Sequence, residues 1–239
     1  MRGSGLVGLM VGLAACSDAT LPPPGALQAA VTVPPPALVA PAAVRNFRDV
    51  VARVEPVAEA ICRARTRGLP CDLRIVVDDR PGVQANAFQT TDSAGRPIVG
   101  FTLALLDDAR NEDEIAFVMG HEAAHHIAGH MNRQQQSAMT GALVAGVLAS
   151  MSGADEAAIT QAQNMGATVA ARQFSKDFEL EADALGAEIA WAAGFDPVRG
   201  AEFFARLPDP GDAFLGTHPP NAQRIALVRR TLAQLEAGR

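Results

Sequence analysis

Two histidines one helical turn apart, His121 and His125, constrain most strongly how this chain can fold. Residues four apart point from the same face of a helix, so both imidazoles can bind one ion with Glu122 beside them. The same stripe carries Phe117 and Val118, so these polar groups interrupt an inward-facing apolar surface. Because buried His and Glu side chains need polar partners, this pattern favours a metal ion between them.

The segment before the two histidines carries the signal of a helix start. Asn111 can accept a hydrogen bond from a free backbone N–H, and Glu114 follows three residues later, as in a capping box. We predict a helix from this cap to about Met131. His126 points away from the histidine pair, and His130 is placed to interact with the C-terminus of the helix, so both are assigned structural roles.

Zinc is the metal that this pair of ligands favours. Catalytic zinc takes imidazole nitrogens in a tetrahedral arrangement and keeps one position for water. The ion lowers the pKa of that water to about 7. Glu122 can then act as the general base that takes the proton and later passes it to the leaving amine. The expected cofactor is one Zn²⁺ per chain.

A third zinc ligand has to come from another part of the chain. The zinc motif with a third histidine ten residues after the first is absent, because position 131 is Met and His130 lies one residue early. Farther on, Glu179 and Asp183 share a helix face, whereas Glu181 points roughly the other way. We predict Glu179 as the ligand and Asp183 as the group that orients a zinc-bound histidine. A solvated acidic helix face is the alternative.

The rest of the chain predicts a mostly helical α+β fold with a small antiparallel sheet. Apolar residues at helical spacing predict a helix from near Asn46 to Gly68, which Pro56 should kink or divide in two. Three strands and three later helices are also expected. The strands are 73–77, near 84–89 and 97–103; the helices are 178–193, 196–207 and one opened by Pro219-Pro220.

A long segment from Gln134 to Ala171 has only two charged residues, Asp155 and Glu156. Its core, residues 139–151, is apolar and rich in Gly and Ala, and is too short to cross a membrane. We expect a buried helical hairpin. The alternative is a flap over the cleft or a surface that touches lipid.

The N-terminal residues 1–15 are predicted to be a signal peptide. A short apolar run ends in Leu13-Ala14-Ala15-Cys16, which resembles a bacterial lipobox, in which the Cys receives lipid. Cys16 is therefore the expected lipidation site, and Ser17 after it favours the outer membrane by the same resemblance. An ordinary cleaved signal is the alternative.

Residues 16–44 are predicted to be a tether that links this anchor to the domain 45–239. Proline-rich runs and the lack of Lys or Arg over residues 17–44 indicate an extended segment. In an exported domain, Cys62 and Cys71 can form a disulfide across the turn between them, worth about 2–3 kcal/mol. Two free thiols are the alternative.

Four segments, in order, resemble the zinc metallopeptidases of the HtpX and CAAX-prenyl-protease type, peptidase family M48. They are Asn86-Ala87-Phe88, residues 111–125, residues 178–186 and residues 217–225. The resemblance covers residues 45–235 and implies a zincin domain of the gluzincin type in which Glu179 completes the zinc site. It also implies that His218 and Arg224 approach the cleft, where they could stabilise an oxyanion or hold substrate. His218 could instead cap the metal, and Arg224 could be a structural ion-pair partner.

The expected function is that of a zinc-dependent endopeptidase that cleaves unfolded or misassembled cell-envelope proteins. The resemblance is greatest to soluble periplasmic members, so we expect a periplasmic enzyme that is lipid-anchored, in the outer membrane. Asn86, Ala87 and Phe88 could pair with an extended polypeptide substrate. A net charge of −6 without a basic cluster argues against nucleic acid. The alternative function is a lipid-anchored chaperone or assembly factor with a latent zinc site.

Overall fold

The computed structural model describes residues 41–173, 175–209 and 218–238, which belong to one compact unit. The predicted signal peptide, Cys16 and nearly all of the predicted tether lie outside these residues. Helix α1 spans Pro41–Arg65 and continues through Pro56 as one helix, so the predicted division is wrong. Pro56 and Ala52, whose carbonyl loses its helical hydrogen bond, are both exposed, so water can satisfy that carbonyl.

A three-stranded sheet follows α1 in the order β1-β3-β2. Strands β2 (Ala87–Thr91) and β3 (Pro97–Thr102) are antiparallel, but β1 (Arg74–Asp78) runs parallel to β3, so the sheet is mixed. The expectation of an antiparallel sheet is therefore wrong for β1. Strand β3 is the most buried of the three and takes the central position, so β1 pairs with β3 instead of with its neighbour in sequence.

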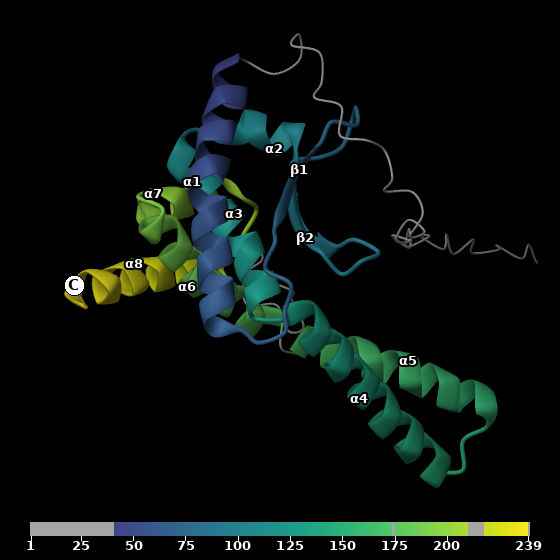
Figure 1. Cartoon of the computed structure of the whole chain (residues 1–239). Helices are drawn as coiled ribbons and strands as arrows, with labels where there is room; N and C mark the ends of the chain where they lie inside the picture. The colour runs from purple at the N-terminus through teal and green to yellow at the C-terminus, as the bar shows by residue number, and fades with distance from the viewer. Residues whose placement is uncertain (1–40, 174, 210–217, 239) are drawn as a thin grey trace, which may run out of the picture. The chain divides into compact units, whose positions relative to one another are not determined.

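Helix α3 (Glu112–Ile127) lies at the centre of the described domain (Figure 1). Its predicted cap is present, since the Asn111 side chain accepts a hydrogen bond from the Glu114 amide. The helix ends before the predicted Met131, because Gly129 adopts a left-handed conformation and the chain turns into the next helix.

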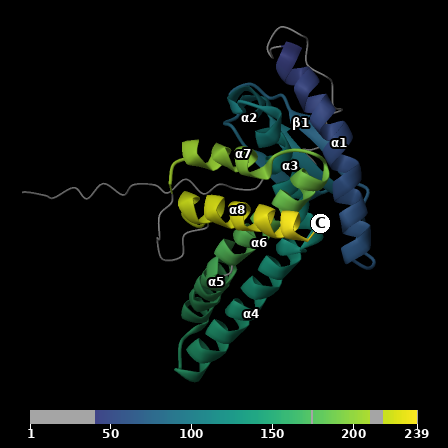
Figure 2. The ribbon, with the colours of Figure 1, turned by 90° about the vertical axis from the view of Figure 1, so that its left-hand side faces the viewer.

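The remaining helices surround α3 on several sides, as Figures 1 and 2 show. The short helix α2, capped by Thr102, was not anticipated from the sequence. Helices α1, α6 and α7 pack against α3, and α8 packs against α6 and α7. Their bounds are α2 Leu103–Asp108, α6 Ser175–Ala192, α7 Pro197–Ala201, the 3-10 helix η1 Glu202–Arg206 and α8 Asn221–Ala237.

Helices α4 (His130–Met151) and α5 (Glu156–Gln173) form the predicted hairpin. They pack on each other through small residues, and their large apolar side chains are exposed, so the expectation of a buried hairpin is wrong. A Cβ on Gly141 would collide with the Gly166 carbonyl oxygen, so the two backbones are too close for bulky side chains between them. Within the part of the chain that the structure describes, no helix is both long enough and apolar enough to cross a bilayer.

Candidate metal centre

The site lies where helices α3 and α6 cross at two glycines. A Cβ on Gly120 would lie 2.6 Å from the Gly186 carbonyl oxygen, and a Cβ on Gly186 would lie 2.7 Å from the His121 amide nitrogen. Only glycine allows backbones to approach this closely. The crossing brings the α3 face that carries His121 and His125 opposite the α6 face that carries Glu179.

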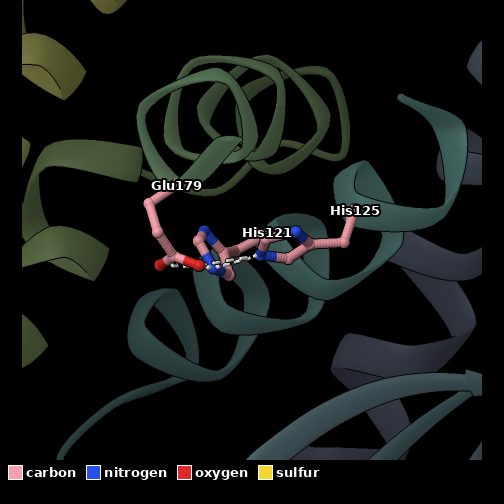
Figure 3. A group of neighbouring side chains, drawn as sticks. All are labelled: His121, His125 and Glu179. Carbon is pink, nitrogen blue, oxygen red and sulfur yellow. Dashed lines mark hydrogen bonds and ion pairs between the residues drawn. The ribbon is translucent and has the colours of Figure 1, made fainter. Parts of the chain in front are cut away.

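Three side-chain groups converge at this crossing (Figure 3). Nε2 of His121 lies 3.0 Å from Nε2 of His125. The Glu179 carboxylate oxygens lie 3.6 Å from the first nitrogen and 3.4 Å from the second. Ligand atoms about 2.0–2.1 Å from a tetrahedral zinc ion stand roughly 3.3 Å from one another, so each of these distances is close to the separation of two zinc ligands.

The partner of His121 fixes which of its nitrogens is free to bind a metal. Nδ1 of His121 lies 3.0 Å from Oδ1 of the fully buried Asp183. Burial alone would raise the pKa of Asp183, but the hydrogen bonds from His121 and Arg224 hold it below its usual value. The carboxylate of Asp183 is thus the group beside Nδ1, and Nε2 is the nitrogen that faces His125 and Glu179.

A second chain of contacts does the same for His125. Its Nδ1 lies 2.8 Å from Nδ1 of His130, whose Nε2 lies 3.2 Å from the Glu181 carboxylate. Burial lowers the pKa of His130 to about 4, so this ring is neutral at pH 7 and has one donor and one acceptor. Since Glu181 can only accept, His130 accepts from His125, whose Nε2 is then bare.

Two imidazole nitrogens and a carboxylate in contact need a positive charge between them. Without a metal ion a proton has to supply it: burial alone would lower the pKa of His121, but the carboxylates of Asp183, Glu179 and Glu122 raise it. The donor set of His121, His125 and Glu179 therefore fits a metal ion, and its nitrogen-rich chemistry suits zinc.

Glu122 lies beside this donor set in a cavity of about 390 Å³. The three candidate ligands line this cavity. Four other residues selected from the sequence line it as well: Asn86, Ala87, His218 and Arg224. Burial raises the pKa of Glu122 above its ordinary value. A carboxyl group with a raised pKa in a cleft has the character of a proton acceptor and donor.

Arg224 enters the site from α8 and forms a buried pair with Asp183. Its Nε and Nη2 donate to the two carboxylate oxygens at 2.8 and 2.7 Å, and Nη2 also lies 3.3 Å from Glu179. The guanidinium packs on the Phe204 ring at 3.6 Å. Burial alone would raise the pKa of Glu179, but His125, His218, His121 and Arg224 hold it well below its usual range.

The other residues selected from the sequence lie partly in the cavity and partly outside it. His218 is exposed, and its Nδ1 lies 3.1 Å from the Glu179 carboxylate. Asn86 and Ala87 line the cavity at the start of β2. The Phe88 ring lies over Gly100 on the neighbouring strand and is not part of the cavity lining. Cys62 and Cys71 form a disulfide with a Cα–Cα distance of 5.7 Å.

Sequence reasoning missed the contact between His130 and His125. His130 begins α4, because the left-handed Gly129 turns the chain after α3, and its ring meets the ring of His125 in the last turn of α3. The ring also stacks on Phe178, with 4.7 Å between ring centroids. A glycine directly before a histidine at a helix end was the only signal in the sequence.

Comparisons with known proteins find similarity to metalloproteases. The sequence profile of Peptidase family M48 matches residues 45–232. The chain is 31% identical over 144 residues to the mitochondrial metalloendopeptidase OMA1 of Arabidopsis thaliana. It is 34% identical over 151 residues to the beta-barrel assembly-enhancing protease of Escherichia coli K12. It is 28% identical over 150 residues to the metalloprotease LoiP of the same organism.

These alignments cover 59%, 55% and 60% of this chain, respectively. They cover 28%, 30% and 57% of the relatives, so the chain matches less than two thirds of the length of each. The similarity therefore concerns the domain that carries the metal centre.

Proposed function

Because the chain belongs to peptidase family M48, a family of metalloproteases, we propose that it is a zinc-dependent endopeptidase of unfolded or misassembled cell-envelope proteins. His121, His125 and Glu179 hold the zinc in this proposal. The observation that carries it is the convergence of the imidazole nitrogens of His121 and His125 and the carboxylate of Glu179 beside Glu122.

Zinc, when bound, polarises the substrate carbonyl and lowers the pKa of water. Glu122 takes a proton from the attacking water and returns it to the nitrogen of the leaving amine. The raised pKa of Glu122 suits both steps, since a stronger base takes the proton and the resulting acid gives it up later.

Asp183 and Arg224 hold the metal ligands in place in this mechanism. Asp183 fixes the ring of His121, and Arg224 neutralises Asp183 while contacting Glu179. Nε and Nη2 of Arg224 both contact carboxylates, so we assign Arg224 a positioning role. His218 is more exposed and is the residue that we propose contacts the substrate oxyanion.

The substrate is proposed to bind as an extended strand along β2. Within the described sheet, β2 pairs only with β3, so its other edge has free backbone donors and acceptors. Asn86 and Ala87 lie at the end of this strand next to the cavity. An unfolded polypeptide can add to such an edge, whereas a folded domain cannot offer an extended segment.

The proposed location is the periplasm, with lipid on Cys16 as the anchor in the outer membrane and residues 16–44 as the tether. The Leu13-Ala14-Ala15-Cys16 pattern supports the anchor. The similarity to a protease whose name refers to the enhancement of β-barrel assembly supports substrates in the cell envelope. Polypeptides and the membrane are thus the expected partners.

Glu122→Gln tests the mechanism. The variant should retain zinc, measured by elemental analysis, and cleave denatured casein roughly 10²- to 10⁴-fold more slowly than the wild type. Glu156→Gln, on the exposed hairpin turn, is the matched control and should cleave at the wild-type rate. Equal cleavage by Glu122→Gln and the wild type would overturn the proposed mechanism. A zinc-loaded wild type that suppresses client aggregation without cutting would favour the chaperone alternative.

A further inference from the structure

The outer face of α4 carries six large apolar side chains that are about half exposed or more. They are Met139, Leu143, Val144, Val147, Leu148 and Met151, with exposed fractions from 49% to 80%. Together they expose about 700 Å² by their residue sizes, compared with the roughly 800 Å² that each partner contributes to a standard interface. Apolar patches of this size are unusual on a monomer and mark a binding surface.

The internal packing of the hairpin explains why this face is free. The side of α4 toward α5 carries small residues, among them Gly141, Ala145 and Gly146, which approach Gly166 and Gln163. The six large apolar residues of α4 lie mainly away from this contact, and this is why they are exposed. Figures 1 and 2 both show the hairpin standing clear of α1, α7 and α8.

We propose that this face binds the same face of a second copy of the chain, with the two α4 helices antiparallel. In one such register, Leu143 lies opposite Leu148 of the second copy, and Val144 lies opposite Val147. The same pairing recurs on the other side of the two-fold axis, so one surface satisfies both copies. Antiparallel apolar helix pairs pack in this way in helical bundles.

The charges of the hairpin favour this orientation. Asp155 and Glu156 lie at the turn, whereas Arg133 and Arg172 lie near the base, and all four are exposed. An antiparallel pair puts the acidic turn of each copy toward Arg133 and Arg172 of the other, where Arg133 also pairs with Glu181 of its own chain. A parallel pair would bring four carboxylates together, which opposes association.

The same charges disfavour a lipid bilayer as the occupant. Helices that lie on membranes carry Lys and Arg on their polar face. From Gln134 to Ala171 the hairpin has no Lys or Arg, and its turn carries Asp155 and Glu156. Tip-first insertion would desolvate both carboxylates.

Cysteine cross-linking in cells that produce the full chain tests the proposal. Leu143→Cys and Leu148→Cys are introduced together; five residues apart on one helix, they are too distant to bond within a chain. Under mild oxidation we expect a disulfide-linked dimer on a non-reducing gel. The paired variant with Gln161→Cys and Thr168→Cys, which are exposed on α5, should stay monomeric.

A second variant tests whether the cross-link reports a stable dimer or only random encounters between chains. Leu143→Glu should reduce the mass of the purified protein from two chains to one in sedimentation, while the cleavage of casein is retained, and Gln161→Glu should leave the dimer intact. A monomeric wild type without the cross-link would overturn the proposal. A different occupant would also overturn it. In that case the Leu143→Cys and Leu148→Cys variant would be a monomer, and only membranes or unfolded casein would protect its introduced thiols from a charged thiol reagent.

Discussion

The α3–α6 pair and the α4–α5 hairpin are built on the same contact, two glycines that let helix backbones touch. Gly120 and Gly186 form it in the first pair, and Gly141 and Gly166 form it in the second. In the first pair, the residues beside the crossing are polar, and other elements cover them. In the second, they are small and apolar, and the bulky residues face solvent.

The difference shows what a close helix crossing can be used for. Around α3 and α6, the short distance between backbones brings the candidate ligands of the two helices within 3.6 Å of one another. In the α4–α5 hairpin, the two helices pack closely through small side chains. The large side chains of α4 are then available to contact another molecule. The close packing is thus shared, and the neighbouring side chains decide its use.

The largest expected effect comes from the buried ion pair that only the first region has. Arg224→Leu leaves Asp183 charged and fully buried, which should lower the free energy of unfolding by about 3–5 kcal/mol. Arg133→Leu removes an exposed pair with Glu181 at the base of the hairpin and should cost less than about 1 kcal/mol. Urea unfolding measures both. Equal losses would mean that burial does not distinguish the two pairs.

An added methyl group at each crossing compares the two regions directly. Gly186→Ala and Gly166→Ala both force a Cβ onto backbone atoms, at a cost of about 1–3 kcal/mol, and both gain about 1 kcal/mol in helix propensity. Only Gly186→Ala should also lose zinc and casein cleavage, because it moves His121 away from Glu179. If Gly166→Ala loses zinc to the same degree, the hairpin is coupled to the site in a way that the contacts do not explain.

The orienting contact of His125 gives the smallest expected effect. His130→Phe keeps a ring that can stack on Phe178 but removes the acceptor for His125, so zinc affinity should fall about 10- to 100-fold. Competition with a fluorescent zinc chelator measures this affinity. Met131→Ala, on the exposed neighbouring position, is the control and should bind zinc like the wild type. Unchanged affinity in His130→Phe would remove His130 from the orienting chain.

Local sequence patterns predicted most of the secondary structure. The cap at Asn111, the strands around Val76 and Val99 and the helix that carries Glu179 all depend on neighbouring residues, so they could be recognised without tertiary structure. Patterns could not predict the parallel pairing of β1 with β3, because strand neighbours are chosen by competition for the buried centre of the sheet.

The exposure of the hairpin also needed the structure. An apolar stretch around Leu143 is equally consistent with burial in the domain and with exposure on an arm. The contact between Gly141 and Gly166 shows that the small residues of this stretch pack against α5, so its large residues face outward.

The sequence by itself determined the chemistry of the site: two imidazoles one turn apart, a carboxylate next to the first, and a second acidic helix face with Glu179 and Asp183. These follow from helical periodicity, which is local. Only the tertiary structure decided that His130 orients His125 and that Arg224 is committed to Asp183. Those contacts join residues whose approach depends on a left-handed glycine turn and on the packing of α8 against α6, and periodicity within one helix carries no information about either.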